Sequence, residues 1–227
     1  MKTFTIGKKK IVLKEEWMVG FITTWIVGLL AHAYRFFNFL PIWDSIYNFT
    51  GVGSTYTLGR WFLGYAGLIT SMFDLPWING AFSLFYISIV VILLTEMFEI
   101  KNKGMIVLCA AIFVSFPTVV SSFAYMYTAD AYLLAFLLAT LAVYLTWCVK
   151  KWGTIAGMVC LAFAMGIYQA YATVVIVLVL LYIIRQFVIE KLDFLEAVRK
   201  DLKYLGMLVG GAVLNAVILK ITLIRYN

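Results

Sequence analysis

Two charged side chains in this chain have the types needed to transfer a group onto a hydroxyl. Asp44 follows a long apolar segment, and Arg60 stands in the sequence Gly59-Arg60-Trp61. A carboxylate can remove a proton from an attacking hydroxyl as a general base. The planar guanidinium of an arginine suits bidentate binding of phosphate, and its fixed charge can stabilise a departing phosphate. Together they predict a transfer reaction with a phosphate leaving group.

Each of these residues also has a purely structural interpretation. Asp44 is followed by Ser45, and an aspartate here could cap a turn or a helix that begins at that serine. Arg60 could close its loop through a salt bridge to Asp74 or Asp130. The sequence alone leaves both alternatives open.

A second group of candidates suits a sugar ring. Tyr125 and Asp130 stand at the start of a later apolar run, and Tyr168 and Gln169 interrupt another. Aromatic rings present a flat, partly apolar wall, and the polar groups can bond sugar hydroxyls. The structural alternatives are a helix cap for Asp130, and satisfaction of free backbone groups for Tyr168 and Gln169.

The charges between these candidates indicate how a membrane would position them. The chain is 64% apolar and 13% charged, which exceeds the apolar content of ordinary soluble domains. Fourteen of its 18 basic residues fall in four clusters, and the positive-inside rule predicts that these face the cytoplasm. The clusters are Lys2, Lys8, Lys9, Lys10 and Lys14; Lys101 and Lys103; Lys150 and Lys151; and Arg185, Lys191, Arg199, Lys200 and Lys203.

The apolar runs predict an all-α polytopic membrane protein, a single transmembrane domain over residues 1–227 with its amino terminus inside. A bilayer requires about 20 apolar residues per helix, which gives seven spans. They cover approximately 17–37, 80–98, 104–120, 129–149, 153–168, 171–188 and 204–224, with a structured first outer loop over 38–79.

Four details refine this prediction. The break within the uncharged run 153–188 is placed at Tyr168-Gln169-Ala170-Tyr171, and an interfacial helix is expected within Leu58 to Phe73. Residues 190–203 have the spacing of an amphipathic cytoplasmic helix that precedes the last span. Because the chain stops three residues after that span, a truncated protein or a fragment is expected.

The composition also argues against other classes of protein. A net charge of +7 acts here as an orientation signal, and no soluble basic segment suits nucleic acid. Cys109, Cys148 and Cys160 lack metal-site spacing, and the single histidine, His32, excludes a multi-histidine centre. We therefore predict no resident metal or cofactor, with a divalent ion shared by Asp44 and a donor phosphate as the alternative.

The order of these features resembles a known family. A Lys-rich head and an acidic residue after the first span are followed by three short motifs: Gly59-Arg60-Trp61, Tyr125-Met126-Tyr127-Thr128-Ala129-Asp130 and Gly166-Ile167-Tyr168-Gln169. This arrangement is similar to the bacterial and phage glucosyl transferases of O-antigen modification, within the GT-C class of polytopic glycosyltransferases. The resemblance covers about Ala31 to Val188.

The resemblance implies a function and a set of roles. Such enzymes move a sugar, here a hexose and most simply glucose, from a polyprenyl-phosphate donor to a cell-surface glycan on the outer side of the cytoplasmic membrane. Asp44 matches the catalytic acidic position, Arg60 and Trp61 the Gly-Arg-Trp element, and Asp130 and Gln169 later polar positions. A flippase and a donor-synthesising enzyme are the implied protein partners. Two alternatives are a non-catalytic membrane subunit or lipid-linked-sugar flippase, and a small-solute transporter, for which no inverted repeat is visible.

Overall fold

The computed structural model describes residues 2–6, 9–47, 57–70, 74–191 and 193–226. The chain begins with an antiparallel hairpin of β1 Lys2–Ile6 and β2 Lys9–Leu13, which the sequence analysis did not predict. Beyond this hairpin, the regular elements of the described chain are all helices. The predicted all-α class is therefore confirmed.

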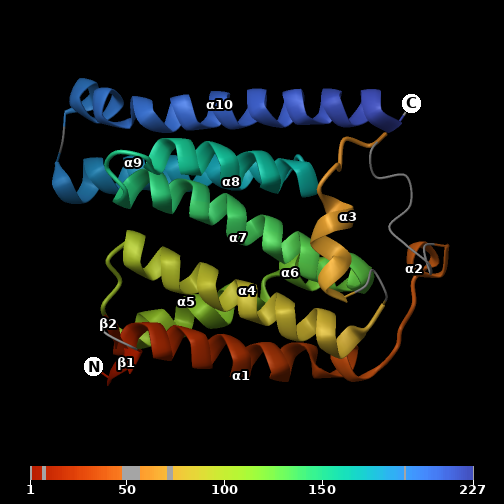
Figure 1. Cartoon of the computed structure of the whole chain (residues 1–227). Coiled ribbons are helices and arrows are strands. Elements are labelled where there is room, and N and C mark those ends of the chain that lie inside the picture. The colour runs from red at the N-terminus through yellow and green to blue at the C-terminus, as the bar shows by residue number, and fades with distance from the viewer. Residues whose placement is uncertain (1, 7–8, 48–56, 71–73, 192, 227) are drawn as a thin grey trace.

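Seven longer helices lie side by side, roughly parallel to one another (Figure 1). They are α1 Glu15–Phe37, α4 Pro76–Met97, α5 Lys103–Ser115, α7 Met126–Cys148, α8 Gly153–Ile167, α9 Tyr171–Arg185 and α10 Phe194–Tyr226. Five helical segments of the described chain are each long and apolar enough to cross a membrane, when Lys103–Cys148 is counted as one and the shorter α8 is left out. The protein is a multi-pass membrane protein, and the count of seven spans stays a prediction.

Shorter elements gather at one end of these helices, which we call the loop end (Figure 1). They are α2 Trp43–Tyr47, α3 Leu63–Ala66, η1 Gly67–Thr70, α6 Pro117–Ser122 and η2 Phe123–Tyr125. The opposite end, which we call the hairpin end, holds β1 and β2 and the connection between α9 and α10. Within the predicted outer loop, residues 48–56 and 71–73 lie outside the described residues.

Two helices differ from the sequence prediction. The span expected over 104–120 ends as α5 at Ser115, because Pro117 lacks a backbone N–H and begins α6 instead. The amphipathic helix expected over 190–203 begins only at Phe194, after the π-helix η3 Gln186–Glu190, and it is continuous with the span expected over 204–224 as one helix, α10. The helix continues through their junction although Gly206 lies two residues beyond it, and no proline interrupts it.

Helix α7 is the central element that positions the site. It packs against α4 on one side and against α8 on the other. The approach of α8 is close because Gly157 has no side chain: a Cβ there would lie 2.7 Å from the carbonyl oxygen of Ala142. Small residues permit such close crossings in membrane bundles. Helix α7 is thus packed on both sides, and its first turns carry Tyr127 and Tyr132 at the loop end.

Candidate functional site

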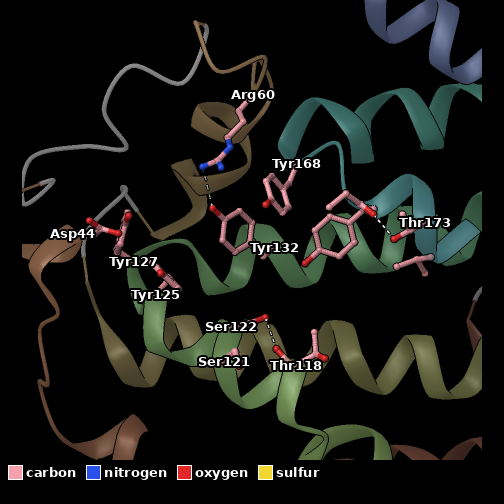
Figure 2. Close-up of a pocket in the computed structure, with 13 residues that line it drawn as sticks. Asp44, Arg60, Thr118, Ser121, Ser122, Tyr125, Tyr127, Tyr132, Tyr168 and Thr173 are labelled. Atoms are coloured by element: carbon pink, nitrogen blue, oxygen red, sulfur yellow. Dashed lines mark hydrogen bonds between the residues drawn. The ribbon is translucent and has the colours of Figure 1, made fainter.

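A cavity of about 550 Å³ opens at the loop end, between α2, α6, α7 and the start of α9 (Figure 2). It is lined by Asp44, Arg60, Thr118, Ser121, Ser122, Tyr125, Tyr127, Tyr132, Tyr168, Ala170, Tyr171, Thr173 and Val174. Four of the seven predicted site residues are among them, namely Asp44, Arg60, Tyr125 and Tyr168. The volume falls within the range of small-molecule sites.

Asp44 lies in the first turn of the short helix α2 and is exposed. The next residue, Ser45, is buried, and its hydroxyl oxygen accepts a hydrogen bond of 3.0 Å from the backbone N–H of Ile42. The serine hydroxyl therefore pairs with a backbone N–H group of this turn. Asp44 lies beside Tyr127, with Tyr125 just below (Figure 2).

Arg35, at the end of α1, fixes the segment that leads to α2. Its guanidinium donates to the carbonyl oxygens of Phe123, at 2.8 Å, and Ala124, at 3.1 Å, and also to that of Leu40. These bonds tie the start of the first loop to the element that carries Tyr125. Arg35 thus fixes the segment that leads to Asp44. This is a structural role, as expected of an arginine at the end of a helix.

The Gly59-Arg60-Trp61 motif directs two side chains to different places because of its glycine. Gly59 adopts a φ of +76°, and a Cβ there would lie 2.3 Å from the Gln169 side-chain nitrogen. Only glycine meets both conditions without strain. The next residue, Arg60, lines the cavity, while Trp61 turns into the protein.

Arg60 is held by aromatic side chains. Its guanidinium carbon lies 4.7 Å from the centre of the Tyr168 ring, and its Nη1 donates to the Tyr132 hydroxyl over 3.4 Å. None of the ion pairs found among the described residues includes Arg60. The salt bridge to Asp74 or Asp130 considered above is therefore absent there, and the cation–π contact leaves several N–H donors available to a ligand.

Trp61 lies outside the cavity lining and anchors the loop. It is buried, and its indole Nε1 donates a 2.8 Å hydrogen bond to the side-chain oxygen of Asn215 on α10. Its ring packs over Gly166, where a Cβ would lie 2.5 Å from it. The backbone N–H of the next residue, Phe62, donates to the carbonyl oxygen of Gly166 at 2.8 Å. These contacts hold the Arg60 backbone against α8.

Asp130 also lies outside the lining, buried within α7. Its two carboxylate oxygens accept bonds from the Thr70 hydroxyl, at 3.1 Å, and from the Asn79 amide nitrogen, at 3.0 Å. The Asn79 oxygen in turn accepts from the backbone N–H of Leu75. Because α7 begins at Met126, Asp130 does not cap this helix. Instead it joins η1 and the start of α4 to the central helix.

Gln169 and Tyr168 mark the break between α8 and α9, where the sequence analysis placed one. The Gln169 amide nitrogen donates to the carbonyl oxygen of Leu58 at 3.1 Å, so this side chain closes the turn before Arg60. Tyr168 lines the cavity, and its ring centre lies 5.7 Å from that of Tyr132. One residue of the pair thus faces the cavity and the other supports it.

A row of hydroxyl groups in the cavity lining was not among the residues predicted from the sequence. The hydroxyls of Ser121, Ser122 and Thr173 donate to backbone carbonyls within their own helical turns, at 2.8, 3.0 and 2.6 Å. Their protons are used there, so their remaining lone pairs can accept from a ligand. The Thr118-to-Ser122 spacing on one turn, close to Tyr125, was the available signal. Tyr132 stands among many apolar and aromatic residues of α7, and no feature of the sequence around it marked it as a site residue.

Two further features bear on the chemistry. Asp74 lies at the loop end, where burial raises the pKa of its carboxyl, while the Arg35 charge and the Ser45 hydroxyl act to lower it. Among the described residues, no three His, Cys, Asp or Glu side chains gather as a metal site would require.

These observations define a class. The protein is a multi-pass helical membrane protein in which one cavity at the loop end brings together a carboxylate, an arginine without a carboxylate partner in the described ion pairs, and several tyrosines. The family model described as Glucosyl transferase GtrII matches residues 33–227. The chain belongs to this glucosyl transferase family, as the motif order predicted. No curated protein and no solved structure matches it.

Proposed function

We propose that the protein transfers glucose from a polyprenyl-phosphate donor to a glycan acceptor at the cell surface, such as O-antigen. Membership of the glucosyl transferase family supports the sugar. The observation that carries the rest is that Asp44 and Arg60, both from the predicted first outer loop, line one cavity together with residues of α6, α7 and α9. A base and a cation are the minimal set for displacement of a phosphate.

The reaction uses each group once. An acceptor hydroxyl gives its proton to the Asp44 carboxylate while its oxygen forms a bond to the anomeric carbon of the donor sugar. The bond between that carbon and the phosphate oxygen breaks, and its electron pair leaves with the polyprenyl phosphate. The Arg60 guanidinium stabilises the negative charge that develops on that oxygen. A phosphate leaving group requires no general acid.

The arrangement around Arg60 supports this role. The Tyr168 ring beneath the guanidinium and the Tyr132 hydroxyl at Nη1 fix its plane. A fixed donor fork loses less freedom on binding and stabilises charge without reorganisation. Asp44, Tyr127 and Arg60 all line the same cavity, so the carboxylate and the guanidinium face a common space.

The remaining lining fits a sugar. Lone pairs of the Ser121, Ser122 and Thr173 hydroxyls can accept hydrogen bonds from sugar hydroxyls. Tyr125 and Tyr168 provide ring faces and hydroxyls. We assign substrate contact to Asp44, Arg60, Tyr125 and Tyr168, and support of the loop to Trp61, Asp130 and Gln169.

The clusters of basic residues support an orientation. With Lys-rich segments in the cytoplasm, the amino terminus lies inside and the loop end faces outward across the cytoplasmic membrane. The donor then reaches the cavity from the outer leaflet, after a flippase has moved it there and another enzyme has synthesised it. Cysteine accessibility at Ser121 and at Asp193 would test this orientation.

The function is tested by transfer of radiolabelled glucose from polyprenyl-phosphate glucose to membrane glycan. Asp44→Asn keeps the size of the side chain and removes its basicity, so transfer should fall by roughly 10² to 10⁴-fold. Asp193→Asn is the matched control, since Asp193 is an exposed carboxylate at the hairpin end. Its transfer should equal that of the unaltered protein at equal expression.

The other outcomes separate the alternatives. Equal transfer in Asp44→Asn and in the unaltered protein would remove Asp44 as the base. No transfer by any form, together with donor movement across vesicle membranes, would support the flippase alternative instead.

A further inference from the structure

A second cavity continues from the polar one along the side of the bundle. It has a volume of about 420 Å³ and an almost entirely apolar lining: Ile112, Phe113, Phe116, Thr118, Val119, Ser122, Leu133, Phe136, Tyr171 and Val174. Leu133 and Phe136 of α7 form its floor. Its walls come from α5 and α6 on one side and from α9 on the other. We call this cavity the apolar groove.

The apolar groove and the polar cavity are continuous. Four residues line both of them: Thr118, Ser122, Tyr171 and Val174. Together the two cavities therefore form one amphipathic site, polar around Asp44 and Arg60 and apolar toward α5.

A row of aromatic rings joins the arginine to the groove. From Tyr168, which lies under Arg60, the ring of Tyr171 is 6.3 Å away, and that of Phe136 lies 6.3 Å further. Phe113 stacks on Phe136 at 5.4 Å. A ligand with a phosphate at Arg60 thus meets an unbroken aromatic path from the polar cavity to the groove.

We propose that the apolar groove holds the isoprene units next to the phosphate of the donor lipid. This inference rests on the proposed function, which places the donor phosphate at Arg60. A single long chain attached to that phosphate must leave the cavity through apolar surroundings to reach the bilayer, and the groove adjoins the cavity. A phospholipid carries two acyl chains, whereas one groove adjoins the polar cavity.

The groove is also accessible from lipid. Ile112 on α5 and Phe116, the residue after that helix, line the groove and are each 53% exposed. Since lipid tails are as apolar as these side chains, placing a chain here gains little affinity. What the groove provides is position, because it fixes the direction in which the phosphate and the anomeric carbon face Asp44 and Arg60.

The test uses polyprenyl phosphate, without sugar, that carries a photoreactive diazirine in its second isoprene unit. After irradiation of the purified full chain in nanodiscs, mass spectrometry identifies the labelled peptides. Labelling should fall on 112–119 and 133–136 and should be displaced by unlabelled polyprenyl phosphate but not by an equal excess of phosphatidylethanolamine. Labelling elsewhere, or equal displacement by both lipids, would overturn the proposal.

A matched pair of variants strengthens the test. Ile112→Trp fills the groove from its exposed wall, and labelling should fall by roughly tenfold. Ile155→Trp makes the same exchange at a 50% exposed site on α8, away from the groove, and should label as the unaltered protein does. Equal labelling of the two variants would contradict the assignment.

Failure of the function is distinguishable from failure of this inference. Specific groove labelling without glucose transfer would reject the transfer reaction and keep the lipid site. Transfer that is lost in Asp44→Asn but equal in Ile112→Trp and Ile155→Trp would keep the reaction and reject the groove.

Discussion

Charged side chains have different partners at the two ends of the helix bundle. The five ion pairs of the described chain all involve residues of the hairpin end: Lys14–Glu96, Lys103–Glu15, Arg185–Glu99, Arg185–Glu190 and Lys200–Glu190. At the loop end, Arg35 donates to backbone carbonyls and its charge also acts on Asp74, whereas Arg60 lies on the ring of Tyr168. A paired cation stabilises a structure, whereas one held by neutral groups keeps its charge for a ligand.

The same contrast applies to the acids of the loop end. Asp130 is buried and accepts bonds from Thr70 and Asn79, while Asp44 is exposed and lines the cavity. A buried carboxylate that lies away from the cavity joins elements together. An exposed one can receive a proton from a substrate. Four predictions test these contrasts.

The largest effect is expected from a matched pair of arginines. Arg60→Gln should reduce glucose transfer by about 10² to 10³-fold, the loss typical for removal of one group that stabilises a developing oxyanion. Arg185→Gln, at the hairpin end, should lower the thermal midpoint, because Arg185 pairs with Glu99 and Glu190, and should leave transfer per folded protein unchanged. Equal losses of transfer in the two variants would remove the contrast between the ends.

The second prediction concerns the structural role of the buried Asp130 carboxylate. Asp130→Asn places an amide N–H₂ group against a donor and should lower the free energy of unfolding by about 2 to 3 kcal/mol. Denaturation in detergent micelles, followed by tryptophan fluorescence, measures this loss, with Asp193→Asn as the exposed control. The folded fraction should retain most of its transfer activity; complete loss of transfer with unchanged stability would make Asp130 part of the catalytic set.

A smaller effect is expected where the Arg60 loop is anchored. Trp61→Phe removes the indole N–H that donates a hydrogen bond to the Asn215 side-chain oxygen. The free energy of unfolding should fall by about 1 kcal/mol, the scale of interhelical hydrogen bonds in membranes. Combining it with Asn215→Leu should add little further loss, since the two side chains share one bond. Additive losses would show that the bond contributes nothing to stability.

The smallest effect concerns pH. Burial raises the pKa of Asp74 above its usual 3.8, so the folded protein binds this proton more tightly than the unfolded chain. The charged form is thus unfavourable at neutral pH, and stability contributed by protonation appears as pH falls through the raised pKa. Asp74→Asn should therefore raise the thermal midpoint slightly at pH 7, with the gain disappearing toward pH 4. A gain that is independent of pH would contradict this.

Much of the molecule was predictable because apolar length and charge placement are local properties. The break at residues 168–171 follows from a run too long for one helix. By contrast, the β1–β2 hairpin and the unbroken α10 depend on pairing and helix continuity, which hydrophobic runs do not encode. Of the candidate residues, Asp44, Arg60, Tyr125 and Tyr168 line the cavity.

The sequence by itself determined the class of protein, the apolar segments and the residue types that could transfer a sugar, since these depend on composition and on spacing along the chain. Only the tertiary structure decided which polar residues meet. The sequence does not distinguish Asp130 from Asp44. In the folded protein, hydrogen bonds from Thr70 and Asn79 give Asp130 a structural role. Close packing brings segments over 100 residues apart into contact, as Leu58 and Gln169 are, and no local pattern specifies such contacts.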